Sequence, residues 1–189
     1  MNSQRTDIQG LRGIAVLAVV FYHANQLVHG GFVGVDIFFV ISGYVIFNSI
    51  IREYGITGLI SVQDFVVRRI HRLLPALSFL IIGTLTASVL VLSPFGAQQQ
   101  VAHTSQAASL FTANIYLALQ NSYFALVNNP LRHTWTLAVE EQFYLCLIVF
   151  LYVLHLIARK ISAEFTKLVL RSVIVLGVIS FLLSVMFSF

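Results

Sequence analysis

The residues LLPALSFLIIGTLTASVLVL, from Leu73 to Leu92, decide the fold class of this chain. They form an apolar stretch of the length that a transmembrane helix needs, about 20 residues. No Asp, Glu, Lys or Arg occurs anywhere from Leu73 to Leu131, and the whole chain of 189 residues is 58% hydrophobic and 10% charged. A soluble domain carries about 25% charged residues. The composition therefore predicts an all-α, polytopic helix bundle in a membrane and excludes a soluble domain.

The hydropathy pattern predicts about five membrane spans. They lie near residues 13–28, 32–51, 73–92, 136–156 and 172–189. A weaker stretch, 107–127, is interrupted by polar residues. We expect this weaker stretch to be re-entrant or to lie at the membrane interface, because irregular backbone is tolerated at membrane depth only where protein or a cavity surrounds it.

Basic residues indicate how the spans are oriented, because cytoplasmic loops are enriched in Lys and Arg. Two precede the first span, Arg5 and Arg12. Four lie between the second and third spans, namely Arg52, Arg68, Arg69 and Arg72, and four lie between the last two spans, namely Arg159, Lys160, Lys167 and Arg171. This pattern predicts a cytoplasmic N terminus, provided that 107–127 does not cross the membrane. The net charge of +4 is explained by these loops, so we expect no nucleic-acid partner.

The basic segment 62–74, VQDFVVRRIHRLL, has apolar residues at helical spacing. It predicts a juxtamembrane amphipathic helix, with Pro75 in the first turn of the next span. One interpretation is that its arginines bind lipid phosphates, and charge alone favours it. The other interpretation is a binding site for an anionic cofactor.

Four ionisable residues lie inside the predicted spans, where such side chains are rare and often functional. They are His23, Asp36, Glu140 and Glu141. Arg12 stands at the inner end of the first span, and the interval of 11 residues to His23 puts both side chains on one helical face, about 16 Å apart. An imidazole can accept a proton from a hydroxyl near neutral pH. A lone His in an apolar helix can equally be a structural residue.

The three carboxylates leave several roles open. Asp36 suits either a helix cap or a partner for His23. Glu140 and Glu141 point about 100° apart on a helix, so one can face a cavity while the other pairs with Arg132 or with a basic residue of another helix. Ser42 and Gly43 suit a close helix contact. No spacing in the sequence predicts a metal site.

Four blocks of the sequence resemble the membrane acyltransferase 3 family, in the family's order. They are DIQGLRGIA with His23, FVGVDIFFVISGY from Phe32, RRIHRLLP from Arg68, and HTWTLAVEEQFY from His133. The match is specific and is similar to the bacterial O-antigen and cell-surface polysaccharide O-acetylases. It covers the part of the chain from residue 7 to residue 144.

The resemblance implies an enzyme that moves an acyl group, usually acetyl, from cytoplasmic acetyl-CoA to a carbohydrate hydroxyl outside the membrane. Acetyl-CoA is then a donor substrate, and no bound cofactor is expected. Arg12 and His23 match the family's essential pair, and Arg69 and Arg72 match its second basic motif. The resemblance thus implies that Arg12, Arg69 and Arg72, with Arg68 beside them, hold the donor phosphates.

In this scheme His23 either deprotonates the acceptor hydroxyl or first accepts the acyl group itself. Glu140 or Asp36 would orient the imidazole, which makes His23, Arg12, Glu140 and Asp36 the expected catalytic residues. The expected partners are the lipid bilayer, acyl-CoA and a surface polysaccharide such as lipopolysaccharide O-antigen. The expected location is the bacterial inner membrane of the cell envelope.

Two alternatives stand beside the enzyme. In the first, His23, Asp36 and Glu140 form a proton relay of a transporter. In the second, the chain is an inactive membrane fragment. The family's membrane domain is larger than the spans counted here, so we expect residues 1–189 to be its N-terminal portion, with the C-terminal part missing.

Overall fold

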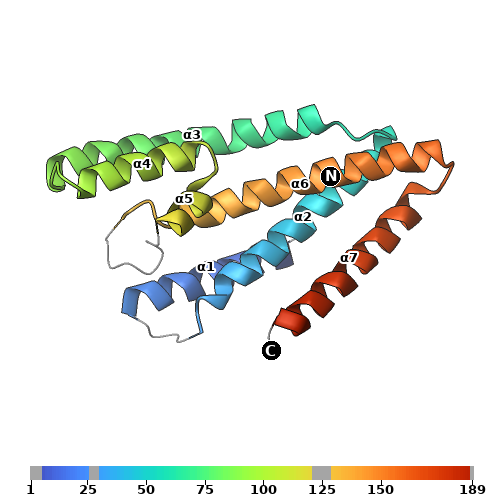
Figure 1. Ribbon diagram of the computed structural model, residues 1–189, viewed down its shortest axis with the longest axis horizontal. Coiled ribbons are helices and arrows are strands. Elements are labelled where there is room, and N and C mark those ends of the chain that lie inside the picture. Colours follow the sequence, from blue (N-terminus) through green and yellow to red (C-terminus); the bar gives the residue numbers. More distant parts are fainter. Residues whose placement is uncertain (1–5, 26–29, 121–128, 188–189) are drawn as a thin grey trace.

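The computed structural model describes residues 6–25, 30–120 and 129–187, and these residues form helices and connecting turns without a strand (Figure 1). The helices are α1 Thr6–Asn25, α2 Val33–Thr57, α3 Val62–Val91, α4 Ala97–Ser109, α5 Ala113–Leu119, α6 Thr134–Lys160 and α7 Phe165–Phe187. The predicted all-α fold class is confirmed.

Four of the described helices, α2, α3, α6 and α7, are long and apolar enough to cross a membrane. They correspond to four of the five predicted spans. The remaining prediction, 13–28, falls on α1, which is helical up to Asn25. Residues 26–28 lie outside the described residues, as do the last two residues of the prediction 172–189.

Helix α3 joins two segments that the sequence predicts separately, the amphipathic helix 62–74 and the span 73–92. The side chain of Ser61 caps it by accepting a hydrogen bond from the backbone N–H of Asp64 at 3.2 Å, and the helix then continues through Pro75 to Val91. The placement of Pro75 in the first turn of a separate helix is therefore wrong. The amphipathic segment 62–74 and the span 73–92 are thus one continuous helix, which begins at the cap formed by Ser61.

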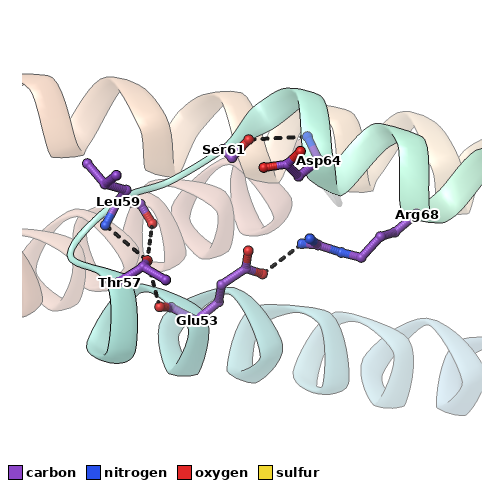
Figure 2. Close-up of polar contacts among 6 residues, drawn as sticks. All are labelled: Glu53, Thr57, Leu59, Ser61, Asp64 and Arg68. Carbon is purple, nitrogen blue, oxygen red and sulfur yellow. Dashed lines mark hydrogen bonds and ion pairs between the residues drawn. The ribbon is translucent and has the colours of Figure 1, made fainter.

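A short turn connects α2 to α3 and is held by local hydrogen bonds (Figure 2). Gly58 ends α2 in the left-handed conformation, with φ of 68°, and its N–H donates to the carbonyl of Tyr54 at 2.7 Å. The hydroxyl of Thr57 donates to the carbonyl of Glu53 at 2.9 Å. Across the turn, Arg68 of α3 pairs with Glu53 of α2 at 2.7 Å. The turn thus sets α3 against the end of α2.

The weak stretch 107–127 forms parts of two short helices, up to the limit of the described residues at Gln120. The backbone breaks between α4 and α5, where Phe111 has a positive φ of 52°. Gln142 of α6 supports this break: its side-chain amide donates to the carbonyl of Phe111 at 2.8 Å and exchanges hydrogen bonds with Asn114 at 3.0 Å. Neither helix has the roughly 20 residues that a span needs; the placement of this segment in the bilayer stays a prediction.

Helix α6 is the centre of the described structure, since α2, α3, α4, α5 and α7 all contact it. In Figure 1 it runs between α2 and α3, and α7 leaves its end at an angle. The largest buried cluster joins the second half of α2 and the starts of α3 and α7 to α6. Helix α1 packs against α2, where Gly34 lies against the fully buried Ala15.

Candidate active site

His23 lies in the last turn of α1 with an exposed side chain. Its Nδ1 atom is 2.8 Å from the carbonyl oxygen of Val19, one turn earlier. A carbonyl oxygen can only accept a hydrogen bond, so Nδ1 carries the proton in this arrangement. In the neutral form of this tautomer, the other ring nitrogen, Nε2, is the one that can accept a proton.

Arg12 lies on the same continuous helix as His23. The shared helical face and the axial separation of about 16 Å expected for this pair require an unbroken helix between them, and α1 is unbroken from Thr6 to Asn25. The Nε atom of Arg12 is buried and has no hydrogen-bond partner among the described residues. A buried N–H donor without a partner is unfavourable, which makes this atom a candidate to bind an anion.

Asp36 lies in the first turn of α2 and is exposed. The residue at the N-cap position is Phe32, and no side chain caps this helix. Within the described part of the chain, Asp36 forms neither a hydrogen bond nor an ion pair with His23 or with another residue. Its carboxylate is favourably placed against the helix dipole.

The three arginines of the basic block have different surroundings. Arg68 is exposed and pairs with Glu53. Arg72 is exposed and makes no hydrogen bond or ion pair with a described residue. Arg69 is largely buried: its side chain is 14% exposed, and it forms an ion pair with Glu141 of α6, whose side chain is 12% exposed.

The contacts of Arg69 extend beyond this ion pair. Both Nη2 and Nε face Glu141, the second at 3.4 Å from Oε2. The guanidinium carbon lies 4.3 Å from the centre of the Tyr144 ring, a distance at which a cation attracts an aromatic face. The hydroxyl of Tyr144 donates to Oε1 of Glu140 at 2.9 Å. These four residues form one cluster between α3 and α6, which we call the arginine–tyrosine cluster.

Helix α2 also packs against α6. A Cβ atom added at Gly43 would lie 3.6 Å from the ring of Phe143, an ordinary van der Waals distance. Ser42 is buried, and its hydroxyl oxygen has no partner among the described residues. The space beside Gly43 thus accommodates a Cβ atom, and the close helix contact predicted at Ser42 and Gly43 stays a prediction. Trp135, at the start of α6, lies edge-on to Phe39 of α2.

Four of the predicted site residues fall into two groups. Arg12 and His23 share α1, whereas Arg69 and Glu140 meet in the arginine–tyrosine cluster; no hydrogen bond or ion pair between described residues joins the groups. Sequence reasoning left the partner of Glu141 open and did not single out Tyr144. Its position four residues after Glu140, on the same helical face, was the available signal.

Comparison with known proteins identifies the family. A family model described as "Acyltransferase domain" matches residues 5–189. The chain belongs to this acyltransferase family. The match covers both groups of candidate residues.

Two relatives from Staphylococcus aureus support the assignment. A protein named "Putative O-acetyltransferase SACOL0978" in strain COL is 44% identical over 156 residues, which are 81% of this chain and 26% of the relative. The O-acetyltransferase OatA of strain NCTC 8325 is 41% identical over 152 residues, 78% of this chain and 25% of the relative. The matched part of the chain thus spans about a quarter of the length of these relatives. No solved structure matches the chain.

Proposed function

We propose that this acyltransferase moves an acetyl group from acetyl-CoA on the cytoplasmic side of a bacterial inner membrane to a hydroxyl of a carbohydrate on the outer side. The observation that carries the proposal is the contact of His23 with Val19: Nδ1 faces the carbonyl oxygen of Val19, and this orientation leaves Nε2 as the nitrogen that can act as a base. Membership of the family and the names of the relatives support acetyl transfer to oxygen.

In the proposed reaction, Nε2 of His23 removes the proton from the acceptor hydroxyl. The hydroxyl oxygen attacks the thioester carbonyl carbon, a C–O bond forms and the C–S bond breaks. The thiolate of coenzyme A then takes up the proton. Positioned proton transfer of this kind accelerates reactions about 10² to 10⁴-fold.

Arg12 and Arg72 are the proposed ligands of the donor phosphates. The buried Nε of Arg12 lacks a partner among the described residues, and Arg72 is exposed and unpaired within them. Charge-assisted hydrogen bonds from guanidinium groups suit phosphate oxygens. Arg68 can contribute when its exposed ion pair with Glu53 opens, since exposed pairs are weak, about 0–1 kcal/mol.

The proposal is tested with inside-out membrane vesicles that contain the protein and a surface polysaccharide in their lumen. Labelled acetyl-CoA is added outside, and label in the carbohydrate is measured. We expect incorporation that depends on the protein and a raised KM for acetyl-CoA in Arg72→Gln. Incorporation no higher than in vesicles without the protein contradicts the proposal.

A further inference from the structure

Arg69 is surrounded differently from its neighbours in the basic block. Its side chain is 14% exposed, compared with 54% for Arg68. Two guanidinium nitrogens face the carboxylate of Glu141, and this fork is the geometry with which an arginine would otherwise bind phosphate. To bind a phosphate, Arg69 would have to leave Glu141 buried without a counter-charge, which is strongly unfavourable.

Tyr144 connects Arg69 to Glu140. The tyrosine is 3% exposed, and its ring lies beneath the guanidinium at 4.3 Å. The ring is therefore fixed on one face by a cation that Glu141 holds in place. Its hydroxyl donates to Oε1 of Glu140, so the orientation of the ring sets the orientation of that carboxylate.

Glu140 is held at one oxygen only. Oε1 accepts the hydrogen bond from Tyr144, and Oε2 has no hydrogen bond to a residue in the described part of the chain. Glu141, one position later, has both oxygens directed at Arg69. Of the two adjacent carboxylates, Glu140 is thus the one that is oriented and still able to accept a further hydrogen bond.

We infer that Arg69 and Tyr144 are positioning residues that hold Glu140 for the transfer reaction, and that Arg69 does not contact the acyl donor. This inference rests on the proposed function, because it assigns a role within that reaction. It separates the two arginines that the family resemblance groups together: Arg72 remains a proposed donor ligand, and Arg69 acts through Tyr144.

The link between Tyr144 and Glu140 is tested first, without any ligand. Thermal unfolding in detergent is measured for Tyr144→Phe, Glu140→Gln and the double variant. We expect the decrease in melting temperature of the double variant to be smaller than the sum of the decreases of the two single variants. Once either residue is changed the hydrogen bond is lost, so the second change removes no further hydrogen bond. Additive losses overturn the inference. Tyr152→Phe is the matched control, since Tyr152 is exposed on the same helix and should show no such coupling with Glu140→Gln.

Kinetics then test the role of Arg69. Tyr144→Phe and Arg69→Lys should lower kcat roughly ten- to hundredfold, the size of effect expected from a misplaced group, while the KM for acetyl-CoA stays within about twofold. Arg72→Gln should instead raise this KM. If Arg69→Lys raises the KM as Arg72→Gln does, the inference is overturned.

A second variant covers the case in which Arg69→Lys does not fold. The double variant Arg69→Gln with Glu141→Gln leaves no unpaired buried charge, and its affinity for coenzyme A is measured by titration. An affinity within about threefold of the wild type, about 0.65 kcal/mol, supports the inference, and a loss of tenfold or more overturns it. The unfolding experiment needs neither donor nor activity, so failure of the proposed function is distinguishable from failure of this inference.

Discussion

His23 is oriented by its own helix. The sequence predicts Asp36 or Glu140 as the group that orients the imidazole, whereas the nearest hydrogen-bond acceptor in the structure is the carbonyl of Val19. This contact is local, because residues four apart lie on the same face of a helix. Because every residue carries a backbone carbonyl, the sequence around His23 gives no signal that singles out the carbonyl of Val19 as its partner.

Gln142 provides a prediction at the scale of a residue. Its amide contacts the carbonyl of Phe111 and the side chain of Asn114, and Gln142→Ala leaves both groups without this partner. We expect a loss of about 1–3 kcal/mol in the free energy of unfolding, the penalty for unpaired buried polar groups. Thermal unfolding in detergent measures it.

The matched control is Gln99→Ala, which changes the same side chain at an exposed position of α4. If the two variants unfold at the same temperature, Gln142 does not stabilise the break between α4 and α5.

The buried ion pair shows what sequence alone could not supply. The pattern of residues predicts that Glu140 and Glu141 point in different directions, and they do contact different partners, Tyr144 and Arg69. The identity of the partner of Glu141 depends on how α3 packs against α6, which no local pattern encodes. The roles of Arg12, His23, Asp36 and Glu140 in catalysis stay predictions.

At the scale of the helices, the contact between α1 and α2 depends on a glycine. A Cβ atom at Gly34 would lie 2.6 Å from the carbonyl oxygen of Ala15 and 2.8 Å from Cγ2 of Val19. Gly34→Ala must therefore push the two helices apart. We expect a destabilisation of about 1–3 kcal/mol, typical of overpacking, measured by thermal unfolding in detergent.

Gly177 of α7 offers the control, because a Cβ atom there meets nothing within 4 Å. Gly177→Ala should leave the stability unchanged or raise it slightly, since alanine is the better helix former. Equal melting temperatures for Gly34→Ala and the wild type would show that α1 and α2 do not approach this closely.

Helix boundaries were predicted less well than helix existence. Long apolar stretches identify α2, α3, α6 and α7, because a helix of about 20 apolar residues is long enough to span the hydrocarbon core of a bilayer. The sequence predicts a helix from residue 62, but it places Pro75 in the first turn of a separate span, whereas α3 continues through Pro75 to Val91. The polar residues of 107–127 predict an interruption from Asn114 onward, whereas the described backbone breaks at Phe111, whose carbonyl accepts a hydrogen bond from Gln142.

At the scale of the whole molecule, the predicted orientation can be tested by cysteine labelling. Cys146 is the single cysteine. The variant Cys146→Ala therefore has no cysteine, and the labelling of one introduced cysteine can be measured in it without background. Gln99→Cys on α4 should react with a membrane-impermeant maleimide in intact cells. Ser162→Cys, between α6 and α7, should react only after the cells are permeabilised. The reverse pattern would contradict a cytoplasmic N terminus.

The central claim is that His23 accepts the proton of the acceptor hydroxyl, and the most direct test is the rate of transfer of labelled acetyl from acetyl-CoA to surface carbohydrate. His23→Ala is compared with His103→Ala, an exposed histidine of α4. We predict that His23→Ala lowers the rate by about 100-fold or more, while His103→Ala keeps the wild-type rate. A folded His23→Ala variant that transfers acetyl at the wild-type rate would contradict the account.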